Sequence, residues 1–90
     1  MPYILPENRG RFDKEIRSLA RKIAFPGELN YVVMQTMMTI LKLGQLKMDY
    51  EYLSRLYADA HLAAEEFRRR VLDPYENYKA MENGDVDGLE

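Results

Sequence analysis

Apolar residues recur at helical spacing along the chain and predict helices from end to end. Between residues 12 and 23 they follow a four-three-four spacing that forms one helical stripe: Phe12, Ile16, Leu19 and Ile23. Asp13 is the expected N-cap of this helix, because Gly10 weakens continuation from any turn that Pro6 opens. Residues 1–5 are expected to form an extended arm, since a proline disfavours the helical region for the residue before it.

A second helix is expected from Glu28, whose carboxylate suits the positive end of a helix dipole, to the break at Gly44. At 100° per residue it carries two apolar stripes. The first holds Leu29, Val33, Thr36, Ile40 and Leu43, and the second, nearly opposite, holds Tyr31, Met34, Met38 and Leu41. The polar wedge between them is narrow: Gln35, Thr39 and Lys42. A helix that is apolar on two sides is either central in its own domain or shared with a second chain.

The third helix is expected from about Asp49 to about Leu72. Its apolar stripe contains Leu53, Leu56, Tyr57, Ala60, Ala64, Phe67 and Val71, and the small residues at its middle would let another helix approach closely. On the outer face each acid precedes its base by four residues, which is the favourable order for an ion pair. The predicted pairs are Glu51 with Arg55, Glu65 with Arg69, and Glu66 with Arg70.

A short fourth helix is expected after a bend at Pro74. Asp73 has the character of an N-cap, Pro74 that of the first helical residue, and Glu76 would complete a capping box. Proline inside a continuous helix would clash with the carbonyl of Arg70, so a kink or a break is predicted. The helix should end at Asn83-Gly84, and an acidic tail over residues 84–90 should fray.

The predicted class is therefore all-α: a small bundle of three main helices plus a short C-terminal helix, in one domain spanning residues 1–90. Ninety residues are too few to divide into two parts that each bury a core. The absence of cysteine excludes a disulfide scaffold and a cysteine zinc site. Neither a signal pattern nor a membrane-length apolar run is present, so a cytoplasmic protein without membrane contact is expected.

Charge is distributed unevenly along the chain. The segment up to Phe25 is basic, with Arg9, Arg11, Lys14, Arg17, Arg21 and Lys22 against Glu7, Asp13 and Glu15. From Asp73 onward the chain is acidic, with Asp73, Glu76, Glu82, Asp85, Asp87 and Glu90 against Lys79. We expect the two ends to attract each other, within one chain or between chains.

Three functions that depend on charged side chains are less favoured than self-association. The first is nucleic-acid binding through Arg9, Arg11, Arg17 and Arg21 together with Arg68, in the run Arg68-Arg69-Arg70, but helix-turn-helix spacing is absent. His61 and Glu65 share a face as half of a metal site, and a partly buried, hydrogen-bonded histidine is the expected state. Glu28, Glu65 and Glu66 are candidates for a magnesium-dependent nucleotide hydrolase, although Glu65 and Glu66 are adjacent instead of one turn apart. No cofactor, metal site or catalytic residue is predicted.

The second stripe of the second helix is the predicted interface of a homo-oligomer, with a dimer favoured. Tyrosine supplies contact area at interfaces and methionine adapts to uneven partners. The alternative is that the short last helix of the same chain covers this stripe through Tyr75, Tyr78 and Met81. We also expect the start of the second helix, at Glu28, Asn30 and Tyr31, to pack against the bend at Pro74, Tyr75 and Glu76, because both are helix starts bordered by tyrosines.

Through several short motifs taken together, the chain resembles a family of short uncharacterised proteins encoded by bacteria, archaea and phages. The motifs are Met1-Pro2-Tyr3-Ile4, Gly27-Glu28-Leu29-Asn30-Tyr31, Arg69-Arg70-Val71, Pro74-Tyr75-Glu76 and Glu82-Asn83-Gly84-Asp85-Val86. The chain departs from the family pattern at Gly10, at the Ala63-Ala64 pair and in an extension after Val86. The resemblance implies a viral or prophage setting as one option and assigns no activity. The function predicted is therefore a non-enzymatic, self-associating module with a structural or adaptor role.

Overall fold

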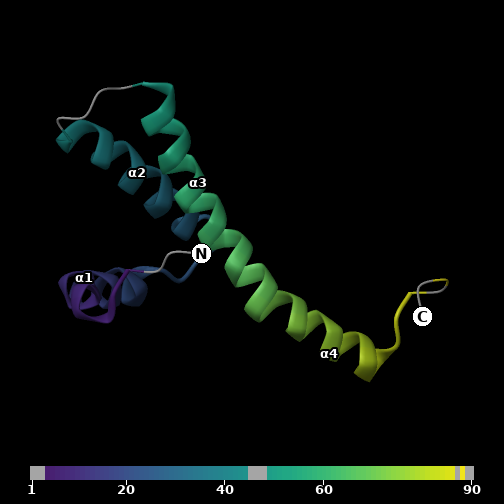
Figure 1. The fold of residues 1–90 in the computed structure, drawn as a ribbon. Helices are drawn as coiled ribbons and strands as arrows, with labels where there is room; N and C mark the ends of the chain where they lie inside the picture. Colours follow the sequence, from purple (N-terminus) through teal and green to yellow (C-terminus); the bar gives the residue numbers. More distant parts are fainter. Residues whose placement is uncertain (1–3, 45–48, 87, 89–90) are drawn as a thin grey trace. The chain divides into compact units, whose positions relative to one another are not determined.

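The structure is a computed structural model that describes residues 4–44, 49–86 and 88. It contains α1 (Pro6–Lys22), α2 (Glu28–Leu43), α3 (Tyr50–Phe67), a π-helical turn, η1 (Arg68–Leu72), and α4 (Asp73–Asn83), as Figure 1 shows. The described residues form no strand. The predicted all-α class is confirmed.

The chain divides into two compact units, Met1–Ile40 and Leu41–Glu90. The first contains α1 and all but the last turn of α2, and the second contains α3, η1 and α4. That residues 1–90 fold as a single domain, with the helices packed as a bundle, stays a prediction.

In the first unit, α1 begins at Pro6, so the predicted start at Asp13 is wrong. Proline occupies the first turn, where its missing N–H costs nothing, and Leu5 before it is extended. The helix continues through Gly10, because one exposed glycine costs only about 1 kcal/mol relative to alanine. Of the predicted N-terminal arm, residues 1–3 lie outside the described residues.

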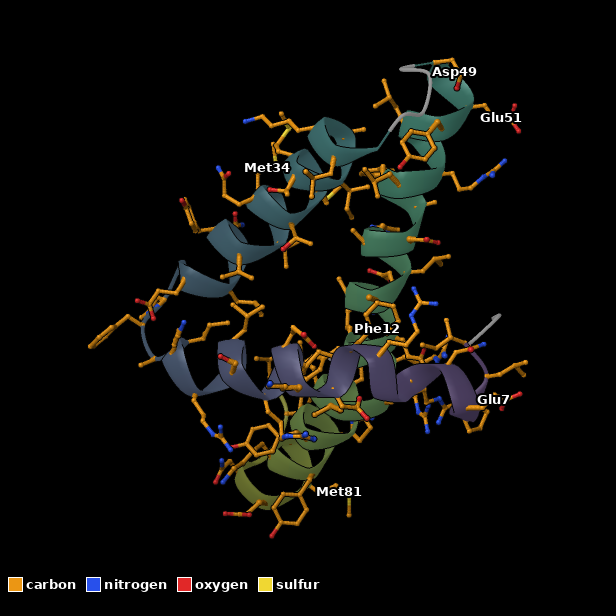
Figure 2. The ribbon with its side chains drawn as sticks, turned by 90° about the vertical axis from the view of Figure 1, so that its left-hand side faces the viewer. Glu7, Phe12, Met34, Asp49, Glu51 and Met81 are labelled. Carbon is orange, nitrogen blue, oxygen red and sulfur yellow. The ribbon has the colours of Figure 1, made fainter. Side chains whose placement is uncertain are left out.

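The second helix has the predicted bounds. It starts at Glu28 and ends at Leu43, immediately before Gly44. Gly27, which precedes it, has a φ of 92°, a conformation that side-chain-bearing residues rarely adopt. The Phe25-Pro26-Gly27 break therefore turns the chain between α1 and α2, and the two helices leave this corner in different directions (Figure 2).

In the second unit, α3, η1 and α4 form one continuous helical rod (Figure 1). Asp49 is the N-cap of α3 and its side chain accepts a hydrogen bond from the Tyr52 N–H at 2.8 Å, as Figure 2 places it at the start of the helix. The rod ends at Asn83, where Gly84 has a φ of 85° and donates its N–H to the Ala80 carbonyl. These ends agree with the sequence prediction.

The predicted capping box at Asp73 does not form. Asp73 and the residue before it are both helical, and no side chain caps α4. The helix instead passes Pro74 through the π turn, in which the Asp73 N–H donates to the Arg68 carbonyl five residues back. Because the hydrogen-bond ladder shifts here, the rod accommodates a residue without an N–H and continues. The predicted kink or break is replaced by this turn.

Apolar side chains remain open to solvent in both units. None of the described residues is buried. The exposed group includes residues from every helix, among them Phe12, Leu29, Met34, Phe67 and Tyr78. Among the described residues, no helix is both long enough and apolar enough to cross a membrane.

Candidate protein interaction surfaces

The second stripe of α2, defined by Tyr31, Met34, Met38 and Leu41, is the first candidate surface. Tyr31 is 66% exposed, Met34 53% and Met38 36%, while Leu41 is half-buried. All four lie on one continuous helix, so the helix itself sets their spacing. Figure 2 shows Met34 projecting away from the α2 ribbon. The chain thus offers an unpartnered row of large, flexible apolar side chains.

The opposite side of α2 is also apolar and exposed. Leu29 at its start, Val33 and Ile40 all present large apolar side chains to solvent. Thr36, on the same stripe, donates its hydroxyl to the Val32 carbonyl one turn back at 2.6 Å, which satisfies the hydroxyl inside the helix. A single partner helix can cover one of the two stripes, and the other then needs a second partner.

A carboxylate organises the corner between α1 and α2. Glu28 Oε1 accepts hydrogen bonds from the backbone N–H of Ala24 at 2.7 Å and of Phe25 at 2.8 Å. These two donors lower the pKa of the Glu28 carboxyl below its ordinary value. The backbone closes the same turn, with the Glu28 N–H on the Phe25 carbonyl and the Tyr31 N–H on the Gly27 carbonyl. Four local hydrogen bonds therefore stabilise the shape of the corner.

This corner encloses an open, mainly apolar hollow of about 510 Å³. Its walls come from the end of α1 and the start of α2: Leu19, Lys22, Ile23, Pro26, Gly27, Glu28, Tyr31 and Val32. Tyr31 belongs both to this hollow and to the predicted interface stripe. The hollow therefore extends the apolar surface of α2 toward α1.

The π turn is bordered by ion pairs. Arg68 contacts Glu65 on one side of the turn, through Nη2, and Asp73 on the other, through Nη1 at 3.4 Å. Arg68 lowers the pKa of the Glu65 carboxyl, and the two acids together raise the pKa of the Arg68 guanidinium. The arginine thus links the residues before and after the shift of the helical ladder.

Two of the three predicted helical ion pairs are confirmed. Arg55 lies 2.8 Å from Glu51, and Arg70 lies 2.8 Å from Glu66. The predicted partnership of Glu65 with Arg69 is wrong, because Glu65 pairs with Arg68 three residues later. Spacings of three and four residues both bring side chains together on a helix, and here the nearer arginine also reaches Asp73.

The predicted cluster at the two helix starts is divided between the units. Glu28, Asn30 and Tyr31 lie in the first unit. Pro74, Tyr75 and Glu76 lie in the second, just after the π turn. Their packing against each other stays a prediction.

The residues named for metal chemistry have other partners. Glu28 accepts backbone hydrogen bonds, and Glu65 and Glu66 pair with arginines. His61 is exposed, not partly buried as expected, and its ring stacks on Tyr57 with centroids 5.7 Å apart. Across residues 4–44, 49–86 and 88, no group of three or more histidine or acidic side chains is placed to hold a metal ion. The described carboxylates therefore give the hydrolase alternative no support.

The apolar stripe of α1 is a further exposed surface. Phe12, Ile16 and Leu19 on this stripe are all exposed. The guanidinium of Arg11 lies 5.0 Å above the Phe12 ring, so a cation borders the stripe directly. The four-three-four spacing already signals this stripe, and its nearness to Arg11 follows from adjacency in the sequence.

Comparison with protein-family models gives a match over residues 1–86 to a family described as Domain of unknown function (DUF6899). A comparison with curated proteins returns no match. No solved structure matches the chain either.

Proposed function

The chain belongs to this family of unknown function, and we propose that it is a self-associating helical module with a structural or adaptor role. The observation that carries the proposal is that α2 presents large apolar side chains on two opposite sides, and neither side is buried. Helices of this length gain most of their stability from packing an apolar face against another surface. We therefore expect both apolar stripes of α2 to be in contact with a partner.

The interface of this module is the second stripe of α2, and its assembly is a homodimer. Tyr31, Met34 and Met38 combine a wide contact area with adaptable shape, which suits contact between two copies of one surface. Charge on this helix is sparse, with Glu28 held at the corner and Lys42 in the last turn. Two copies can therefore approach without burying like charges.

The other predicted roles have less support from the described contacts. Two arginines of the basic run, Arg68 and Arg70, lie against carboxylates, which reduces what they can offer to a phosphate backbone. The magnesium hydrolase would need Glu65 and Glu66, which hold the same arginines. A cytoplasmic location is part of the proposal, and a chain without cysteine is compatible with it. A phage or prophage setting remains a proposal that rests on the sequence resemblance.

The test is sedimentation of the purified chain at micromolar concentration, with Met38→Glu compared with Thr39→Glu. The two substitutions add the same charge to neighbouring positions of α2. Met38 lies in the interface stripe, whereas Thr39 lies in the polar wedge. A carboxylate without a partner is costly to enclose, by several kcal/mol, so Met38→Glu should dissociate the dimer.

We expect a dimer for the wild type and for Thr39→Glu, and a helical monomer for Met38→Glu. Circular dichroism checks that both variants keep their helices. A wild-type chain that sediments as a folded monomer would refute self-association. A dimer that persists in Met38→Glu would refute this choice of interface.

A further inference from the structure

The cations of α1 have no acidic partner among the described residues. The helix carries Arg9, Arg11, Lys14, Arg17, Arg21 and Lys22, and none of the described salt bridges involves them. Four acid–base pairs within α1 have the four-residue spacing of an ion pair, and none of them forms a described salt bridge. They are Glu7 with Arg11, Arg9 with Asp13, Arg11 with Glu15, and Asp13 with Arg17. Positive charge on α1 is therefore free to meet a partner.

The second unit has the opposite balance. Its described salt bridges use Arg55, Arg68, Arg70 and Lys79. From Asp73 onward six acidic residues face the single Lys79, which lies 3.6 Å from Glu82. The C-terminal segment therefore has more negative charge than its own cation can neutralise. Opposite charge on two surfaces both steers association and selects the partner.

Both charged segments also carry exposed apolar side chains. The α1 stripe consists of Phe12, Ile16, Leu19 and Ile23, and its first three residues are exposed. On α4, Tyr75, Tyr78 and Met81 are exposed, and Met81 is 87% exposed. Figure 2 labels Met81 near the end of this helix. Charge complementarity is thus combined with apolar area on the same two elements.

Charge also discriminates between the surfaces that α4 could cover. The second stripe of α2 offers no cation of its own, and the nearest on that helix is Lys42 in the polar wedge. Several cations border the α1 stripe: Arg11 lies over the Phe12 ring, and Lys22 lines the corner hollow with Leu19 and Ile23. The acidic helix is therefore better matched by α1.

We propose that α1 of one copy docks on α4 of a second copy, and that the second copy returns the same contact. This inference rests on the proposed self-association and adds a contact surface to it. A two-fold axis relates the two contacts, so each copy contributes both a basic and an acidic helix. The doubled contact leaves the α2 stripe free to form its own part of the interface.

The geometry of the two helices selects the residues to exchange. On α1, Arg11 and Lys22 border the apolar stripe, whereas Lys14 and Arg21 lie on the opposite side at 100° per residue. On α4, Glu82 lies one turn after Tyr78, and Asp85 follows just beyond the helix end. The contact should therefore depend on the first pair of cations and on these two acids.

The experiment uses full-length chains with two charge reversals each. One variant carries Arg11→Glu and Lys22→Glu, and the other carries Glu82→Lys and Asp85→Lys. Each is measured alone by sedimentation over a concentration series, and the two are then mixed in equal amounts. A matched control, Lys14→Glu with Arg21→Glu, makes the same change of charge on the far side of α1. Circular dichroism confirms that every variant remains helical.

Each reversed variant alone should associate at least about tenfold more weakly than the wild type. The mixture should recover wild-type affinity, because one contact of the mixed dimer then joins two reversed helices and the other joins two native ones. The control should retain most of its affinity. Raising the salt concentration should weaken the wild-type dimer, since added ions screen exposed charges.

Three results would overturn the proposal. A mixture that associates no better than its components would show that the helices do not exchange charge between copies, including the case in which they meet within one chain. A control that loses as much affinity as Arg11→Glu with Lys22→Glu would reduce the effect to net charge. Reversed variants that associate like the wild type would remove the contact. All three leave self-association through α2 standing, whereas a monomeric wild-type chain would overturn both proposals.

Discussion

Truncation of Met34 to alanine measures how much the α2 stripe contributes to assembly. Complete burial of a methionine side chain contributes about 1.5–3 kcal/mol. Met34 is 53% exposed in the single chain, so covering the exposed part contributes about 1 kcal/mol per copy. A two-fold interface contains the residue twice, which gives about 2 kcal/mol, or roughly a 30-fold rise in the dissociation constant.

Sedimentation equilibrium over a range of concentrations gives this dissociation constant directly. Gln35→Ala is the matched control, because Gln35 is the next residue of α2 and lies in the polar wedge. Alanine is a better helix former than either residue, so neither substitution should weaken the helix. An equal change of affinity in the two variants, or none in Met34→Ala, would contradict the assignment of this stripe to the interface.

Two further predictions concern the first unit. Glu28→Gln should make stability depend less on pH. The pKa of the Glu28 carboxyl is lowered in the folded state. The carboxylate therefore stabilises the fold above pH 4.5, its ordinary pKa, and this stabilisation is lost as the pH falls through the lower folded pKa. Urea midpoints at about pH 6.5 and about pH 3 should differ less in the variant than in the wild type, and an unchanged difference would rule out this role. Gly10→Ala should stabilise the chain by about 0.5–1 kcal/mol, because Gly10 is inside α1 and an added Cβ would meet no atom within 4 Å. A lower urea midpoint for Gly10→Ala would show that position 10 is in contact with another surface.

Helix ends with a local chemical signal were predictable from the sequence. The local signals are charge, backbone freedom or a capping side chain, and they occur at Glu28, Gly44, Asp49 and Gly84. The structure places the ends of α2, the start of α3 and the end of α4 at these positions. The start of α1 differs from the predicted Asp13, because Gly10 does not interrupt the helix that Pro6 begins. A single glycine costs less than a helix gains by adding two turns, so the signal of Pro6 at the first position prevails.

The π turn could not be predicted, because its cause is not visible in the hydrophobic pattern. Asp73, Pro74 and Glu76 have the residue types of a new helix start, and a continuing helix competes for the same residues. The outcome depends on whether the ladder can shift by one residue before the proline, where Arg68 also links Glu65 to Asp73. Such a balance involves hydrogen bonds over several turns, and residue spacing does not reveal it.

For the candidate surface, the sequence predicted which side chains share a face of α2 but not what covers them. Tyr31, Met34 and Met38 follow from the helical period alone. Their partner depends on a second surface, and several apolar stripes of this chain have similar size. Charge distinguishes the α1 stripe from the other apolar stripes, because it is exposed and has unpaired cations beside it.

The π turn has a consequence for how this sequence tolerates insertion and deletion. A ladder that reaches five residues back holds one more residue per turn, so η1 is equivalent to a one-residue insertion in an α-helix. Every side chain after it is rotated by about 100° from the direction it would have in an uninterrupted helix. Loss of a single codon between Arg68 and Leu72 would therefore turn the tyrosines of α4 toward a different side. It would also leave Pro74 in an unshifted ladder, where a residue without an N–H kinks the helix.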